Sequence, residues 1–327
     1  MTCFYPIPAY KNFPGSTGIA QGHPVYCEFY SEKERNKIYF CATDEKLGYC
    51  EFDDVPEEYR MLLPCGKCFG CRLDRSRMWA VRCMHEASLH DSNCFITLTF
   101  NNDFLNADRS LDKRDFQLFM MRLRKRFGAG IRFYHCGEYG AKLGRPHHHA
   151  LLFNFDFEDK KLWSVRKGVR LYVSESLQKL WPFGFSTIGD VTYQSAAYCA
   201  RYIMKKKFGF RAQEHYEHRI PEYNTMSRRP GIAYDWYQKF KDDIYPRDLL
   251  VVRSSSSQFL KMKPPKYYDG LYEAESPEEY KEIKDARKER FSSSFSSFQE
   301  YLDSLDSKRV ILKGRLSQLI RVYEDAF

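Results

Sequence analysis

The stretch Gly144–Phe153, with the sequence GRPHHHALLF, places three of the chain's nine histidines at the start of an apolar run. Because side chains of a strand alternate between its two faces, we expect His147 and His149 on one face and His148 on the other. Two imidazoles about 7 Å apart along one strand can bind one metal ion. Glu138, expected in the preceding turn, is a third candidate ligand, and such an N/N/O set suits Mg²⁺ or Mn²⁺ bridged to a phosphate oxygen. The simpler alternative is a polar strand end with solvated histidines.

Two tyrosines of a predicted helix over residues 196–207 could act as nucleophiles. Tyr198 and Tyr202 are four residues apart and therefore share a face, and each is followed three residues later by a cation, Arg201 or Lys205. A phenol is a poor nucleophile at its usual pKa of ~10, but a nearby cation or metal stabilises the phenolate. The same cations would stabilise the charge of a pentavalent phosphate. Without such a role, the pair would be ordinary amphipathic core.

A cluster of thiols forms a second candidate metal site. Cys65, Cys68 and Cys71 make two CxxC steps that share the central sulfur, and Gly66 and Gly70 allow tight loops. A structural Zn²⁺ normally has four ligands. The candidates for the fourth ligand are, in this order, Cys3, Cys50 and His85. An iron–sulfur cluster and three free thiols are the alternatives.

Composition and charge favour a globular chain with a polyanionic partner. The 327 residues are 43% hydrophobic and carry a formal net charge of +9. From Leu271 onward, 12 acidic and 10 basic residues leave −2, so residues 1–270 carry about +11. Such a field attracts nucleic acid or anionic lipid, and the 17% aromatic content would support base stacking. No apolar run reaches the ~20 residues of a membrane span and no signal peptide is recognisable, so we expect an intracellular protein with reduced cysteines and no membrane partner.

The periodicity predicts both strands and helices along the chain, and two of the strands suit an antiparallel pair. Strands are expected at Cys94–Phe100, Ile131–Cys136, His147–Asn154 and Phe185–Tyr193, with a loop at Gly137–Gly140 between the second and third. Helices are expected from Cys71 to about His90, from an N-cap at Ser110 to a stop at Gly128, and over Ser174–Leu180.

Four regions follow from these elements. We expect a Cys-rich N-terminal segment at residues 1–90, packed on a core at 91–251, then a linker at 252–270 and an α-helical C-terminal tail at 271–327. Ser276–Glu279 has the sequence of a capping box, with Pro277 at the first helical position.

Three motifs occur in a characteristic order over about residues 94–207: Phe95–Phe100, Arg145–His149 and Tyr198–Lys205. In these motifs the chain resembles the HUH endonucleases, named for histidine–hydrophobe–histidine, and most closely the replication initiation proteins of microvirus-type single-stranded DNA phages. The segments Cys65–Cys71 and Gly137–Gly140 are similar to those of the gokushovirus branch.

The resemblance implies an α+β fold in which an antiparallel sheet is flanked by helices. His147 and His149 would lie on a central strand, with the tyrosine helix packed across the sheet. These histidines would hold the divalent ion, and Tyr202 and Tyr198 would attack DNA phosphate in turn, with Lys205 assisting. One tyrosine would nick the origin and keep the 5′ end as a phosphotyrosine, leaving a 3′-OH that primes rolling-circle synthesis. The other would then cut and close the displaced strand.

Two positions depart from the family pattern. His148 stands where a hydrophobe or Tyr is usual, which leaves open which of the three histidines bind metal. Arg201 stands where the two-tyrosine phage enzymes usually have Lys, so Tyr202 ranks before Tyr198.

The expected partners are single-stranded or melted origin DNA, contacted by Arg145, Arg201 and Lys206, and host replication proteins such as a helicase. The expected place of action is the host bacterial cytoplasm. The alternative is a non-enzymatic, zinc-stabilised nucleic-acid-binding protein whose histidines are structural and whose tyrosines stack on bases.

Overall fold

The computed structural model describes residues 3–11, 17–20, 23–26, 38–40, 55–56, 59–140, 143–166, 168–201, 210–245, 247–253, 259–294 and 298–317. The chain divides into two compact units, one of Met1–Cys71 with Ser304–Arg309 and the other of Arg72–Asp303 with Val310–Phe327. Among the described helices, none combines the length and the apolar character that crossing a membrane requires.

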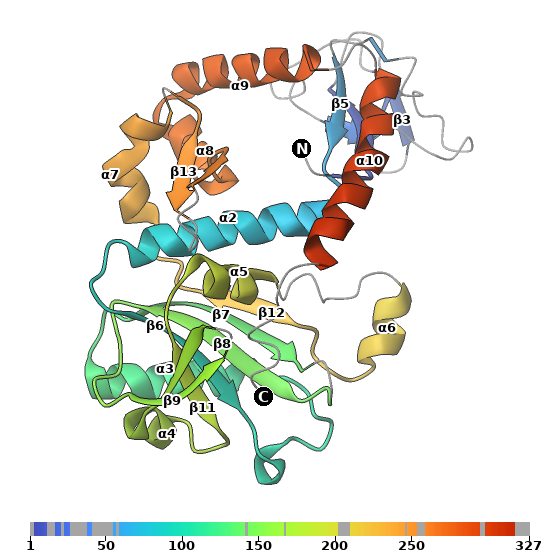
Figure 1. Cartoon of the computed structure of the whole chain (residues 1–327). Coiled ribbons are helices and arrows are strands. Elements are labelled where there is room, and N and C mark those ends of the chain that lie inside the picture. Colours follow the sequence, from blue (N-terminus) through green and yellow to red (C-terminus); the bar gives the residue numbers. More distant parts are fainter. Residues whose placement is uncertain are drawn as a thin grey trace. The chain divides into compact units, whose positions relative to one another are not determined.

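A seven-stranded antiparallel sheet is the framework of the larger unit (Figure 1). Its strands, in spatial order, are β12 (Tyr223–Met226), β7 (Arg132–Tyr139), β8 (Pro146–Phe153), β6 (Asn93–Thr99), β11 (Ser186–Gly189), β10 (Val169–Val173) and β9 (Lys161–Arg166). The histidine strand β8 is therefore central. This confirms the predicted α+β class with an antiparallel sheet flanked by helices.

Each face of the sheet is covered by its own helices and core. On one face, alternate strand residues such as Leu151 and Phe153 pack with helices α2 (Phe69–Ala87), α5 (Tyr193–Arg201), α7 (Tyr234–Ile244) and α8 (Lys266–Glu275). On the other face, Ala150 and Leu152 pack with α3 (Lys113–Phe127) and α4 (Glu175–Leu180). Because period-two alternation assigns each strand residue to one of two buried layers, the register of β8 is firmly determined.

Two predicted boundaries near the site are wrong by a few residues. Glu138 does not lie in a turn: β7 continues to Tyr139, where Gly137, Glu138 and Tyr139 pair with β8. Glycine therefore does not end this strand, because the sheet pairing outweighs its weak strand preference. The predicted N-cap Ser110 is also not the cap; Asp112 accepts a 2.8 Å hydrogen bond from the Arg114 N–H, while the Ser110 hydroxyl is used by the Ile220 N–H at 2.9 Å.

Other predicted elements are present with different lengths. Helix α4 is confirmed with Ser174 as its N-cap, and α2 is confirmed at Phe69–Ala87. The predicted strand at 185–193 is limited to β11, and the predicted helix at 196–207 begins earlier, as α5 at Tyr193. Shorter elements are the 3₁₀ turn η4 (Asn102–Phe104) and α6 (Phe210–Tyr216).

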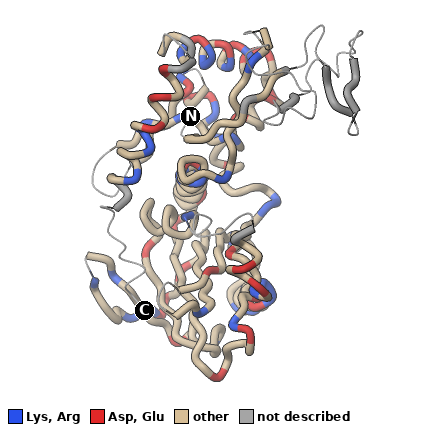
Figure 2. The backbone as a smooth tube through the Cα atoms, turned by 90° about the vertical axis from the view of Figure 1, so that its right-hand side faces the viewer, with Lys and Arg blue, Asp and Glu red and all other residues tan. Residues whose placement is uncertain are grey.

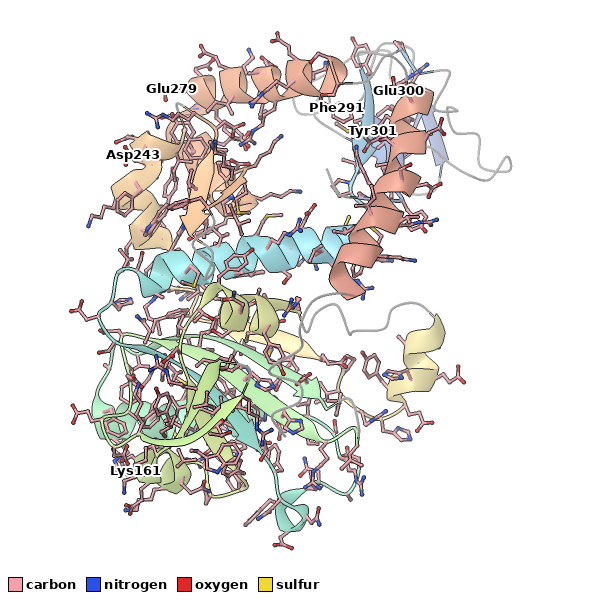
Figure 3. All side chains as sticks on the ribbon, in the orientation of Figure 1. Lys161, Asp243, Glu279, Phe291, Glu300 and Tyr301 are labelled. Carbon is pink, nitrogen blue, oxygen red and sulfur yellow. The ribbon has the colours of Figure 1, made fainter. Side chains whose placement is uncertain are left out.

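The C-terminal part is helical, as predicted. Residues 252–270, expected as a linker, contain most of a two-stranded hairpin, β13 (Leu250–Arg253) with β14 (Phe259–Met262), and the first half of α8. Helices α9 (Pro277–Ser292) and α10 (Phe298–Ser317) follow, and the Phe291 and Tyr301 rings meet edge to face at 5.1 Å (Figure 3).

The predicted capping box is only partly confirmed. Pro277 is the first residue of α9, but the Ser276 side chain makes no capping hydrogen bond. The Glu279 carboxylate instead accepts a hydrogen bond from the Tyr272 hydroxyl.

Short strands build the smaller unit. β1 (Ile7–Lys11) pairs antiparallel with β4 (Ile38–Phe40) on one side and β5 (Arg60–Leu63) on the other. β2 (Thr17–Ala20) and β3 (His23–Tyr26) form a separate hairpin.

Candidate active site

The central strand presents its histidines on opposite faces, as predicted. His147 and His149 lie on the face covered by α5, and Glu138 is paired in register with His147 on β7, so its side chain shares that face. His148 lies on the other face, fully buried against Phe100 and Trp181. His147 and His149 therefore share one face of the sheet, and His148 does not.

His149 is hydrogen-bonded through both ring nitrogens. Its Nε2 lies 2.9 Å from Glu138 Oε1, and its Nδ1 lies 2.9 Å from Thr97 Oγ1 on the neighbouring strand β6. Both His149 and Glu138 are almost completely buried. Because a hydroxyl can donate or accept, Thr97 can hydrogen-bond Nδ1 in either tautomer and hold the orientation of the ring. Metal-binding histidines commonly have such a partner on the ring nitrogen that does not bind the metal.

The donor set fits a divalent cation chemically. Burial and, to a smaller extent, the neighbouring His149 lower the pKa of His147 to about 4. His147 is therefore neutral at pH 7 and can offer a nitrogen lone pair. Two imidazoles and a carboxylate are ligands that Mn²⁺ and Mg²⁺ accept, with positions left for substrate oxygens.

The first tyrosine of the helix motif lies against this histidine. The Tyr198 ring meets the His149 ring edge to face, with the ring centroids 5.2 Å apart. Phe95 of β6 contacts both, at 5.9 Å from the His149 ring and 6.3 Å from the Tyr198 ring. Helix α5 is fixed to the sheet by Cys199, whose Sγ lies 3.4 Å from the Cys136 Sγ on β7. The structure therefore brings Tyr198, His149 and Glu138 together from three elements.

The remaining predicted residues divide into two groups. Arg145 donates to Asn102 Oδ1 and to the Phe100 carbonyl, both at 2.8 Å, so its guanidinium is held beside the end of β6. Arg201 is the last residue of α5. Tyr202, Lys205 and Lys206 lie outside the described residues.

Two polar residues of the site region escaped sequence reasoning. Thr97 lies within the apolar strand motif. Its only signal in the sequence is that it follows Phe95 by two residues and therefore points to the same face of the sheet as Phe95 and His149. His135 lies on the opposite face, where its Nε2 is 3.1 Å from His148 Nδ1 and its Nδ1 is 2.8 Å from Thr225 Oγ1. No sequence pattern relates His135 to His148, because the pairing depends on strand register.

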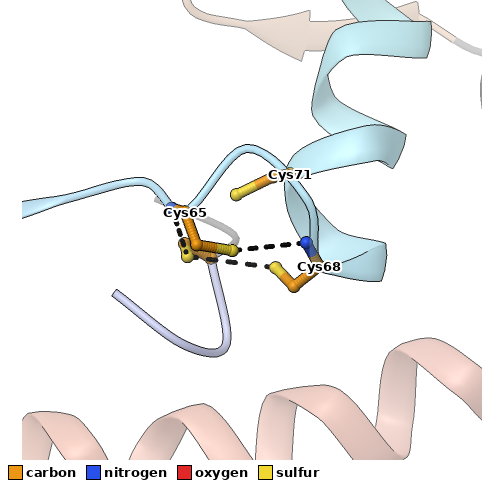
Figure 4. A group of neighbouring side chains, drawn as sticks. Cys65, Cys68 and Cys71 are labelled. Carbon is orange, nitrogen blue, oxygen red and sulfur yellow. Dashed lines mark hydrogen bonds between the residues drawn. The ribbon is translucent and has the colours of Figure 1, made fainter. Parts of the chain in front are cut away.

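The predicted thiol cluster is assembled in the smaller unit (Figure 4). The Sγ atoms of Cys3, Cys65, Cys68 and Cys71 all lie within 4.8 Å of one another, and within the described part of the chain no other set of three or more such donors is gathered as closely. Cys3, the first candidate, is thus the fourth member. His85 is excluded, because it is buried elsewhere, stacked on Trp236 and 2.8 Å from the Tyr268 hydroxyl; Cys50 lies outside the described residues.

Comparison with known proteins agrees with the motif order. The family of the replication-associated protein ORF2 matches residues 93–207, which span β6, β8 and the tyrosine motif. Replication-associated protein VP4 of Bdellovibrio phage phiMH2K is 36% identical over 259 residues, 74% of this chain and 80% of that protein. Replication-associated protein ORF2 of Spiroplasma virus 4 is 34% identical over 228 residues, 67% of this chain and 70% of that protein.

The match to a third relative covers a smaller share of both chains. Replication-associated protein ORF4 of Chlamydia phage 1 is 32% identical over 184 residues, 53% of this chain and 45% of that protein. No solved structure matches the chain. The coverage and identity of the first two relatives confirm the resemblance to replication initiation proteins of small phages, and the chain belongs to the family of phage replication-associated proteins.

Proposed function

We propose that this protein is an HUH-type endonuclease and strand transferase that initiates rolling-circle replication. It nicks single-stranded or locally melted origin DNA and rejoins strands through a 5′-phosphotyrosine, in the cytoplasm of the host bacterium. The observation that carries the proposal is the contact of Tyr198 with His149, which is itself hydrogen-bonded to Glu138. A phenol, imidazoles and a carboxylate then lie on one face of one sheet.

His147, His149 and Glu138 would hold the divalent ion, Mg²⁺ or Mn²⁺. When bound, the ion supplies Lewis-acid activation of the scissile phosphate. Within the chain, Thr97 fixes the His149 ring through Nδ1, and Glu138 faces Nε2. These contacts orient the imidazole before substrate arrives, so little reorganisation is needed during reaction.

The chemical step is a transesterification at phosphorus. The phenolic oxygen of a tyrosine attacks, the bond from phosphorus to the 3′ oxygen breaks, and that oxygen leaves as a 3′-OH after taking up a proton. The phosphate remains on the tyrosine as an ester of the 5′ end. Arg201 and Lys205 would neutralise charge on the phosphate and favour the phenolate. We rank Tyr202 before Tyr198 as a nucleophile; one of the two nicks the origin and the other makes the second transfer.

The substrate is a single strand, because a tyrosine on a helix packed against a sheet cannot reach a phosphate within an undistorted duplex. Arg145 and Lys206 would contact the backbone phosphates, together with Arg201. Host replication proteins such as a helicase would supply the unwound strand.

The test is the formation of a covalent adduct. End-labelled single-stranded origin DNA is incubated with the full chain and Mn²⁺ or Mg²⁺, denatured, and resolved by electrophoresis. We expect a labelled protein–DNA adduct that is reduced in Tyr202→Phe and in Tyr198→Phe and is abolished in the double variant. Tyr193→Phe, at the start of the same helix, is the matched control and should retain the adduct.

The competing function is non-enzymatic binding of nucleic acid, which the thiol cluster favours because zinc modules commonly stabilise small binding domains. Unaltered DNA binding without any adduct, in all metals tested, would support this alternative and exclude the enzyme.

A further inference from the structure

The thiol cluster joins three separate pieces of chain within the smaller unit. Cys3 precedes β1, Cys65 and Cys68 lie in the turn after β5, and Cys71 lies in the first turn of α2. The sulfurs are within 4.8 Å of one another, and Cys68 Sγ is 3.9 Å from Cys3 Sγ. In a tetrahedral site with Zn–S bonds of ~2.3 Å, ligand sulfurs lie about 3.8 Å apart, so this spacing is that of four ligands around one ion.

Backbone donors point at these sulfurs. The Cys65 N–H donates to Cys3 Sγ at 3.3 Å, and the Cys68 N–H donates to Cys65 Sγ at 3.2 Å (Figure 4). The turn between Cys65 and Cys68 uses Gly66 at φ +69°, a conformation that favours glycine. Hydrogen bonds from N–H groups stabilise negative charge on sulfur, which is the ligand form of cysteine.

If Cys3 is a thiolate, its burial requires a compensating positive charge. Cys3 is completely buried, and a buried thiolate without a compensating charge is strongly unfavourable. The eight described cysteines, the four of the cluster included, form no disulfide. The Cys3 sulfur therefore has neither a covalent partner nor solvent to stabilise it as a thiolate.

We infer that Cys3, Cys65, Cys68 and Cys71 bind one Zn²⁺ as a closed, four-thiolate structural site. All four positions are filled by protein, so the ion has no place for substrate and acts on folding, in which it joins the N-terminal segment to the start of α2. An iron–sulfur cubane is disfavoured because each thiolate would bind a different iron, which requires sulfurs farther apart than 4.8 Å. This site is independent of the proposed nicking chemistry.

The two donor sets also differ in the metals they select. Soft thiolates favour Zn²⁺, whereas the imidazole and carboxylate set on β7 and β8 accepts Mg²⁺ or Mn²⁺ in exchange with solvent. Zinc should therefore survive dialysis against EDTA under native conditions, which removes the weakly bound metal.

The experiment measures metal in the purified, EDTA-dialysed full chain by mass spectrometry and the zinc environment by X-ray absorption. We expect about one zinc per chain with four sulfur neighbours at about 2.3 Å. Cys68→Ser and Cys71→Ser should lower the zinc content at least fivefold. Two matched controls should retain it: Cys94→Ala, which removes a thiol from the core of the larger unit, and His149→Ala, which changes the other donor set.

The X-ray absorption of the unsubstituted chain keeps the test decisive if a cysteine variant fails to fold. Nitrogen or oxygen neighbours in place of sulfur, iron in place of zinc, or a folded chain without metal would each overturn the inference. Loss of zinc in His149→Ala would do the same. Failure of the nicking assay would leave this result unaffected.

Discussion

At the scale of single residues, the account depends on how His149 is held. Thr97 contacts one ring nitrogen and Glu138 the other, and Tyr198 packs on the ring. The three contacts come from three elements and fix both the position and the rotation of one imidazole. Thr97 acts through His149 and is therefore a positioning residue.

Thr97→Val removes the hydroxyl and keeps the shape. We expect the Mn²⁺ concentration for half-maximal adduct formation to rise about 10- to 100-fold, the usual effect of losing a partner behind a metal ligand. A rate that stays low at saturating Mn²⁺ would instead indicate a general packing defect. Thr187→Val is the control, because Thr187 is buried opposite Thr97 on β11 and should leave the metal requirement unchanged.

A second residue-scale prediction concerns acid stability. Burial lowers the pKa of His85 to about 3 in the folded chain, below its unfolded value of about 6.5. Protons therefore bind preferentially to the unfolded chain. Neutral His85 contributes fully to the free energy of unfolding above pH 6.5, and this contribution is lost as the pH falls towards 3.

The corresponding variant is His85→Phe, which keeps a ring on Trp236 and cannot titrate. Its free energy of unfolding, from urea titrations at pH 4 to 7, should fall less steeply with decreasing pH, by up to about 1.4 kcal/mol per pH unit. His218→Gln, at an exposed position, is the control. An unchanged slope in His85→Phe would contradict the assignment.

The sequence predicts which face of a strand a residue occupies better than it predicts where the strand ends. The alternation of His147, His148 and His149 follows from strand geometry alone, and the structure confirms it. Glu138 is expected in a turn, since two glycines suggest a loop, but sheet pairing overrides that signal and Glu138 lies in β7. Thr97 and His135 depend on which strands are neighbours, and no local pattern contains that information.

At the scale of elements, local sequence patterns also fail to predict the outer strands of the sheet and the contacts of the C-terminal helices. β9, β10 and β12 were not predicted, because they lie at or beside the sheet edges and have no strong apolar alternation. The linker prediction at 252–270 followed from serines and prolines, yet β13, β14 and α8 occupy the described part of it. Pro277 indicates the start of helix α9, but no sequence pattern predicts the contacts that join α9 to the rest of the larger unit.

That attachment is a buried charge network. The Arg287 guanidinium of α9 donates to Asp248 at 2.5 Å and to Asp269 of α8 at 2.8 Å, and all three side chains are at most 16% exposed. Arg287→Ala would leave the buried Asp269 carboxylate without its cation and Asp248 with only the more exposed Arg290, so we expect a loss of about 3–5 kcal/mol in the free energy of unfolding.

A matched variant exists on the same helix. Lys284 pairs with Glu273, but both side chains are 52% exposed, so Lys284→Ala should cost less than about 1 kcal/mol. Thermal and urea unfolding of both variants would test the comparison. Equal effects would show that the buried network does not attach α9.

At the scale of the whole molecule, charge is unevenly distributed along the chain. Residues 1–270 carry about +11, whereas residues 271–327 carry −2, and α9 shows both signs closely interspersed (Figure 2). A field of this sign over the larger part of the sequence favours a polyanion, and the basic residues of the proposed DNA contact all precede residue 271.

Binding of single-stranded DNA should therefore weaken with salt. The logarithm of the association constant should fall linearly with the logarithm of salt concentration, by about 0.7 for each phosphate contacted. Lys206→Gln and Arg201→Gln should each reduce that slope by about 0.7, whereas Lys284→Gln on α9 should leave it unchanged. Fluorescence anisotropy at several salt concentrations measures the slope. A slope that is equal in all these variants would contradict the assigned contacts.

The central claim is that Tyr202 or Tyr198 becomes covalently joined to DNA in a reaction that requires His149. Trypsin cuts after Arg201 and thereby separates Tyr198 from Tyr202, so tandem mass spectrometry of the digested adduct identifies the nucleophile directly. The account predicts a nucleotide on Tyr202 within residues 202–205, a smaller amount on Tyr198 within residues 180–201, and neither in His149→Ala. A nucleotide on any other residue, or an adduct that persists without His149, would contradict it.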